Sequence, residues 1–199
     1  MSTFRILFVC TGNVCRSPVA EILTRQLLRE AFGAAATDFA VGSAGTTCAD
    51  GARMDARTAA ALAAYGLGGA ADRFRTRRLD ADIVADANVV LALEREHRRQ
   101  VVTLQPAALS TTFCFRELVR LLGAAPRAAL PHDPVARARA AVTLAREQRG
   151  LHGYRSRDAD AIPDPLARPL AEYRTTVELI TATANAFVSF LKTPTRKEK

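Results

Sequence analysis

The sequence predicts an α/β fold with a small four-stranded parallel sheet, doubly wound so that helices cover both of its faces. Apolar strand-like runs alternate with helical patterns along the chain. The first run, residues 5–9, holds four consecutive apolar residues, as in a strand that is buried on both sides. The handedness of strand-helix-strand units then favours parallel pairing. A chain of 199 residues suits one such domain and is short for two.

The elements follow in order from the N-terminus. The first strand ends at a polar loop, after which Ser17 and Pro18 are expected to cap and open a helix that reaches Gly33. Apolar residues spaced three and four apart predict the closing helix especially clearly. Further strands are expected at residues 39–45, 88–93 and 110–115, and further helices at residues 54–66 and 170–191.

Between about residues 123 and 161 the composition changes to alanine, arginine and proline. One helix is expected there, from Asp133 and Pro134 to Gly150. The stretch lacks the large apolar residues of an independent core. We therefore interpret it as an arginine- and alanine-rich helical insertion within a single domain of residues 1–191, followed by a disordered basic tail at 192–199.

The composition is that of a soluble globular protein, with 49% hydrophobic and 24% charged residues. No apolar run reaches membrane-spanning length, and the first residues lack a signal-peptide pattern, so we expect a cytoplasmic protein with no membrane partner. The net charge of +8 predicts attraction to anionic partners. A nucleic-acid-binding or adaptor role is less expected, because aromatic residues are not interleaved with the arginine clusters.

The loop after the first strand carries the strongest chemical motif, in which Arg16 follows Cys10 by six residues. Gly12 and Asn13 between them favour a tight backbone that turns successive N–H groups inward as an anion nest. A thiolate at Cys10 would be stabilised there, and Arg16 could grip two oxygens of a phosphoryl group. The alternative is a structural or redox pair, Cys10 and Cys15, on an ordinary turn.

The same spacing recurs from Cys114 to Arg120, which shows that spacing alone is weak. That stretch contains no glycine, and Glu117 suits a helix start. A structural role is therefore expected for Cys114.

The stretch "VCTGNVCRSP" resembles the phosphate-binding motif of the low-molecular-weight protein tyrosine phosphatases, and the similarity extends through "SAGT", "RTRRL" and "IPDP". The resemblance implies a flavodoxin-like, phosphotyrosine phosphatase I-like domain that hydrolyses phosphotyrosine in proteins through a phosphocysteine, without cofactor or metal. Cys10 would be the nucleophile, Arg16 the phosphate clamp and Asp164 the general acid. The loop would comprise Thr11, Gly12, Asn13, Val14, Cys15 and Arg16, supported by Asn13, Ser17 and Ser43.

Two of these implied roles have alternatives. Cys15 would be a reversible disulfide partner of Cys10, or simply a small residue under the loop. Asp133 also precedes a proline, but it suits the cap of an alanine-rich helix, so Asp164 is preferred as the acid.

The chain departs from the family where phosphotyrosine-specific members carry aromatic walls, since Leu166 and Cys48 stand there. Tyr154 or Tyr173 could supply the missing ring. Phe74 stands near the place of a loop-supporting histidine found in some members. The three histidines of this chain are instead expected in surface or loop roles; they are His97, His132 and His152.

Two related activities are kept as alternatives. Protein-arginine phosphatases resemble this chain in the loop but have threonine in place of Val14, which favours an aryl phosphate here. Arsenate reductases of this fold need further cysteines close together, whereas Cys48 and Cys114 stand alone. The oligomeric state is left open.

Overall fold

A computed structural model describes residues 3–125, 130–152 and 159–192. Its four strands form one parallel sheet in the order β2-β1-β3-β4, which confirms the predicted fold class. The strands are β1 (Phe4–Cys10), β2 (Phe39–Gly45), β3 (Val89–Ala92) and β4 (Thr112–Cys114). The helices are α1 (Arg16–Phe32), α2 (Ala56–Ala63), α3 (Gly68–Arg73), α4 (Ala81–Asp86), α5 (Arg95–Leu104), α6 (Phe115–Gly123), α7 (Pro134–His152) and α8 (Leu170–Leu191), with 3₁₀ turns at Gly33–Asp38 and Pro106–Ser110.

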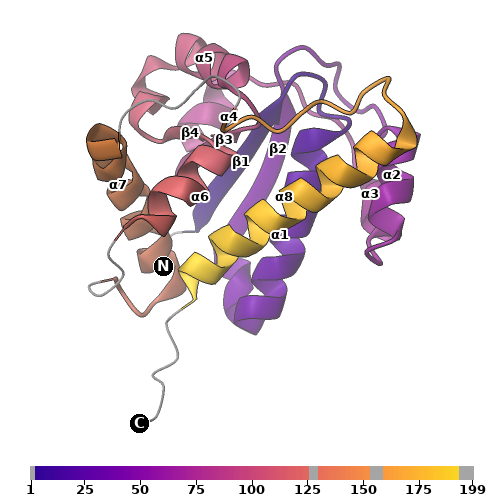
Figure 1. Cartoon of the computed structure of the whole chain (residues 1–199). Coiled ribbons are helices and arrows are strands. Elements are labelled where there is room, and N and C mark those ends of the chain that lie inside the picture. The colour runs from indigo at the N-terminus through magenta and orange to yellow at the C-terminus, as the bar shows by residue number, and fades with distance from the viewer. Residues whose placement is uncertain (1–2, 126–129, 153–158, 193–199) are drawn as a thin grey trace.

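Helices cover both faces of the sheet because the buried strands are apolar on both sides (Figure 1). Alternate residues of β1 show this division: Phe8 packs in a cluster with α1, α6, α7 and α8, whereas Val9 packs in a second cluster with α4 and α5. The chain leaves β2 and crosses over β1 to reach β3, so the strand order reverses beside β1. In doubly wound folds, ligands bind at the carboxyl ends of the strands at such a point.

The predicted start of the first helix is wrong by two residues. α1 begins at Arg16 with Cys15 in the N-cap position, and no side chain caps its first turn. Ser17 therefore lies inside the helix, fully buried, with its hydroxyl 2.9 Å from the Cys10 sulfur. The uncapped N–H groups of the first turn remain available to an anion.

The expected helix at 54–66 is shorter in the structure. Asp55 caps α2 by accepting a hydrogen bond from the Thr58 N–H, and the helix gives way to a turn in which Gly66 has a φ of 73°. The terminal helix α8 is confirmed over the predicted residues and packs along α1 (Figure 1).

The helix expected within the arginine-rich stretch is α7, and it contributes to the main core rather than standing apart. Val135, Ala138, Ala141 and Ala145 lie in the same buried cluster as the sheet and α8. Asp133 accepts a hydrogen bond from the Ala136 N–H, so it caps this helix as expected. Parts of the stretch at 126–129 and 153–158, and the expected tail at 193–199, lie outside the described residues. In the described part of the chain, no helix has the length and apolarity needed to cross a membrane.

Candidate active site

The nucleophile candidate Cys10 is the last residue of β1, where the carboxyl edge of the sheet meets α1. Its side chain is only 2% exposed and lies against the Ser17 hydroxyl. The following loop is tied to the neighbouring strand, since the N–H groups of Thr46 and Thr47 donate to the carbonyls of Cys10 and Thr11. The sulfur therefore has a fixed place below the loop.

Asn13 makes hydrogen bonds to three segments around the loop. It adopts a left-handed φ of 51°, a conformation that asparagine tolerates better than most residues, and it is completely buried. Its amide nitrogen donates to the hydroxyls of Ser17 and Ser43 at 2.8 and 2.9 Å, and its oxygen accepts from the Arg77 N–H at 2.8 Å. Ser43 donates onward to Glu21 at 2.7 Å. These bonds connect α1, β2 and the segment before α4 through one amide.

Arg16 brings the predicted acid to the loop. Its guanidinium is 2% exposed and lies 2.6 Å from an Asp164 carboxylate oxygen, although the two residues are 148 positions apart. It also donates to the Ile162 carbonyl at 3.3 Å and lies 3.4 Å from Glu94. A bound phosphoryl group would compete with these carboxylates for the same guanidinium.

The segment that carries Asp164 is held across the carboxyl edge of the sheet, as the orange trace before α8 shows in Figure 1. The Ile162 N–H donates to the Leu93 carbonyl at the end of β3, and Arg57 of α2 donates to the Arg168 carbonyl. Asp164 itself is 42% exposed, so it can reach a substrate from solvent. The rival Asp133 lies at the start of α7, where its carboxylate accepts a hydrogen bond from the Ala136 N–H.

The expectation for His97 is wrong, because this residue lies inside the site rather than at the surface. It is 1% exposed, and its Nε2 lies 2.8 Å from the Thr11 hydroxyl and 3.1 Å from Glu94. Burial, reinforced by the nearby Arg16 charge, lowers the pKa of His97 to about 4, so the ring is neutral near pH 7. Its Nδ1 has no hydrogen-bond partner among the described residues, which also disfavours a second N–H there.

Glu94 and His97 are the site residues that the sequence reasoning missed. Both follow β3 directly, and the carboxyl ends of parallel strands share one edge. Polar residues that follow a predicted apolar strand are candidates for this edge, and that pattern in the sequence could have indicated both.

The other cysteines differ chemically from a nucleophile. Burial raises the pKa of Cys15 and of Cys114 to about 12, so both stay protonated thiols. Cys114 caps α6 together with Glu117, which confirms its structural role. No disulfide links the four cysteines.

Of the two tyrosines considered as aromatic walls of the cleft, one is excluded by the structure. Tyr173 is 2% exposed beneath Arg57, so it cannot form a cleft wall, and Tyr154 lies outside the described residues. Leu166, 49% exposed, stands two residues after Asp164, and its N–H donates to that carboxylate. Phe74 packs against the main core, where some related chains would carry a histidine. His132 is exposed as expected, whereas the side chain of His152 lies outside the described residues.

Comparisons with known proteins identify the family. Residues 5–129 match the family model described as low molecular weight phosphotyrosine protein phosphatase. A low molecular weight protein-tyrosine-phosphatase from Streptomyces coelicolor is 41% identical over 99 residues, a match that covers 47% of this chain and 59% of that relative. A protein-arginine-phosphatase from Geobacillus stearothermophilus is 33% identical over 118 residues, covering 58% of this chain and 72% of that relative.

Solved structures extend the likeness beyond the matched sequence. The low molecular weight protein tyrosine phosphatase from T. tengcongensis superposes with a TM-score of 0.67 at 24% identity, covering 94% of this chain and 99% of that one. The YwlE arginine phosphatase from Geobacillus stearothermophilus gives a TM-score of 0.66 at 25% identity, covering 94% and 91%. The likeness of fold therefore extends beyond residue 129, where the match to the family model ends.

Proposed function

The chain belongs to the low molecular weight phosphotyrosine protein phosphatase family, and we propose that it is a protein-tyrosine phosphatase in which Cys10 is the nucleophile, Arg16 the phosphate clamp and Asp164 the general acid. The observation that carries the assignment is the meeting of these three residues at one edge of the sheet. The Cys10 sulfur lies beside the uncapped start of α1, and the Arg16 guanidinium joins that loop to Asp164.

The reaction proceeds in two in-line transfers. The Cys10 thiolate attacks phosphorus and the bond to the tyrosyl oxygen breaks, while protonated Asp164 gives its proton to that leaving oxygen. Water then attacks the phosphocysteine, Asp164 accepts a proton from it, and the phosphorus–sulfur bond breaks to release phosphate and restore the thiolate. Throughout, the loop N–H groups and Arg16 stabilise the phosphoryl oxygens.

Ser17 supports the attacking sulfur through its hydroxyl, and Asn13 and Ser43 hold the hydroxyl in place. Cys15 remains a candidate redox partner of Cys10, although its raised pKa makes it a slow thiolate donor. The substrate is a phosphorylated protein, and the place of action is the cytoplasm.

Hydrolysis of para-nitrophenyl phosphate tests the assignment. Cys10→Ser should abolish turnover, and Asp164→Asn should lower kcat by roughly 10²–10⁴-fold because no proton reaches the leaving group. Asp133→Asn is the matched control, since Asp133 caps α7 and should leave kcat unchanged. Full activity in Cys10→Ser would contradict the proposed mechanism. Equal losses of kcat in Asp164→Asn and Asp133→Asn would show that Asp164 is not the general acid.

A protein-arginine phosphatase is the second candidate, supported by the arginine phosphatases among the relatives and solved structures. Val14 favours phosphotyrosine, because an aliphatic side chain there suits an aryl ring better than a guanidinium. Peptides of one sequence that carry phosphotyrosine or phosphoarginine discriminate the two. We expect a higher kcat/KM for phosphotyrosine and a shift toward phosphoarginine in Val14→Thr; the opposite preference in the native chain would assign the second activity.

A further inference from the structure

A cavity lined by arginines lies beside the edge strand β2, and Cys10, Arg16 and Asp164 are not among its lining residues. We propose that this cavity binds a small oligophosphate, a ligand with two or more linked phosphate groups. Such a group occurs in inorganic tripolyphosphate and in nucleoside polyphosphates. The proposal does not rest on the phosphatase assignment, because it concerns binding at other residues.

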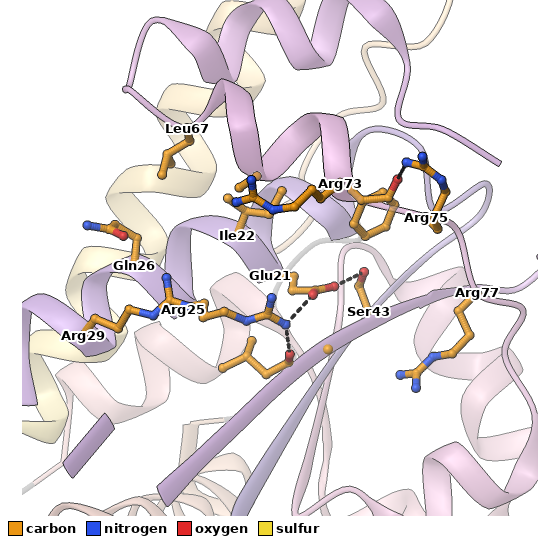
Figure 2. Close-up of a pocket in the computed structure, with 14 residues that line it drawn as sticks. Glu21, Ile22, Arg25, Gln26, Arg29, Ser43, Leu67, Arg73, Arg75 and Arg77 are labelled. Carbon is orange, nitrogen blue, oxygen red and sulfur yellow. Dashed lines mark hydrogen bonds and ion pairs between the residues drawn. The ribbon is translucent and has the colours of Figure 1, made fainter. Parts of the chain in front are cut away.

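The cavity has a volume of about 520 Å³, within the range of small-molecule sites. It is formed by α1, β2, α3 and the segment after α3, and Figure 2 shows the side chains that surround it. Five arginines and one carboxylate, that of Glu21, line it. The five are Arg25, Arg29, Arg73, Arg75 and Arg77.

Three of these arginines have no ion-pair partner in the described part of the chain. Arg29 and Arg73 are exposed on α1 and α3, and Arg77 lies over Gly42, where an added side chain would come within 3.1 Å of its guanidinium. Like charges held around one hollow repel one another, and a polyanion between them relieves this repulsion. Guanidinium groups bind phosphate oxygens with paired, charge-assisted hydrogen bonds.

The remaining charges leave the cavity positive. Arg25 pairs with Glu21 at 2.6 Å, and Arg75 donates to the backbone carbonyls of Asp72 and Phe74. Glu21 is 8% exposed, burial raises its pKa, and among the described residues that line the cavity it is the single carboxylate. Several separated cations suit a chain of phosphates better than a single phosphate ion.

One wall of the cavity is apolar. Ile22, Leu67 and Phe74 line it, and Leu67 and Phe74 flank α3, the helix that carries Arg73. A ligand with an apolar ring could contact this wall while its phosphates bind the arginines. The wall therefore predicts that a nucleoside triphosphate binds more tightly than inorganic tripolyphosphate.

The cavity is also connected to the phosphate loop. Glu21 and Ser43 line it, and Ser43 bonds both to Glu21 and to Asn13, whose amide holds the Ser17 hydroxyl beside Cys10. An anion that attracts Arg25 competes with the Arg25–Glu21 pair and so alters the partner of Ser43. We expect binding in the cavity to change the hydrogen bonding of the Asn13 side-chain amide.

Isothermal titration with sodium tripolyphosphate and with adenosine triphosphate, without magnesium and at low salt, tests the site. The double variant Arg29→Ser/Arg73→Ser should weaken binding about tenfold or more, since two charge-assisted contacts are lost. The control Arg146→Ser/Arg174→Ser removes the same charge from α7 and α8, outside the cavity, and should change the affinity far less. Arg16→Met removes competing binding at the phosphate loop and should leave the cavity site intact.

The outcomes separate the possibilities. Absence of binding to the native protein, equal affinity in the native and double-variant proteins, or binding that disappears only in Arg16→Met would overturn the proposal. Tighter binding of adenosine triphosphate than of tripolyphosphate supports a contact with the apolar wall. Equal affinities for the two ligands would show that the site recognises the phosphate chain alone. In the Arg16→Met protein, the side-chain amide resonance of Asn13 should shift as the cavity fills, and an unmoved resonance would overturn the coupling.

Discussion

Acidification from pH 7 to pH 5 should destabilise the folded protein through His97, and replacement by glutamine should remove this effect. His97 is buried between Thr11, Glu94 and Arg16, and its pKa falls from 6.5 to about 4 on folding. The Asp164 and Glu96 carboxylates act in the opposite direction and favour the protonated ring, but their effect on the pKa is smaller. Burial and the Arg16 charge therefore dominate.

The sign follows from proton uptake. Between pH 6.5 and about pH 4 the unfolded chain binds a proton at His97 that the folded protein does not, so the free energy of unfolding decreases as the pH falls. The contribution of neutral His97 to the free energy of unfolding is fully present above pH 6.5. At pH 5 the unfolded imidazole is about 1.5 pH units below its pKa, and at roughly 1.36 kcal/mol per unit the loss is about 2 kcal/mol.

Urea unfolding of the native protein and of His97→Gln at both pH values measures this loss. Glutamine keeps a hydrogen-bonding side chain near Thr11 but does not titrate. The native protein should lose about 2 kcal/mol more than the variant between the two pH values, because other titrating groups cancel in the comparison. Parallel losses in both proteins would refute the account of a neutral, buried His97.

Two further predictions concern stability. Gly45→Ala would place a Cβ 2.8 Å from the Thr11 carbonyl oxygen and 2.9 Å from the Asn13 Cβ, so urea unfolding should show a loss of roughly 1–3 kcal/mol together with lower activity; Gly123→Ala meets no atom within 4 Å and should not destabilise. Glu117→Ala removes the acceptor of the Cys114 N–H and the partner of Arg149 at 2.9 Å, which should cost about 2 kcal/mol. Loss of the exposed Glu96 in Glu96→Ala should cost far less, and equal losses would contradict the assigned role of Glu117.

Much of the site could be predicted because it is local in the chain. Cys10 to Arg16 lie between a buried strand and a helix, and a short loop in that position needs residues that tolerate a tight backbone, which Gly12 and Asn13 supply. The predicted capping of α7 by Asp133 is likewise local, since the cap bonds an N–H three residues away. The role of the Ser17 hydroxyl could not be decided from local sequence. A serine at that position is equally compatible with an N-cap of the helix and with a buried hydroxyl that supports Cys10.

Apolar periodicity and loop chemistry by themselves determined the four strands, their parallel pairing, the helices α1, α2, α7 and α8, and the motif around Cys10. Only the tertiary structure decided which distant groups surround that motif, namely His97 against Thr11 and Glu94 beside Arg16. It also decided that Tyr173 is buried and that five arginines line one cavity. The physical reason is that strand and helix patterns depend on neighbours within a few residues. Contacts such as Arg16 with Asp164 depend on how helices pack across the sheet, and that packing is set by the whole core.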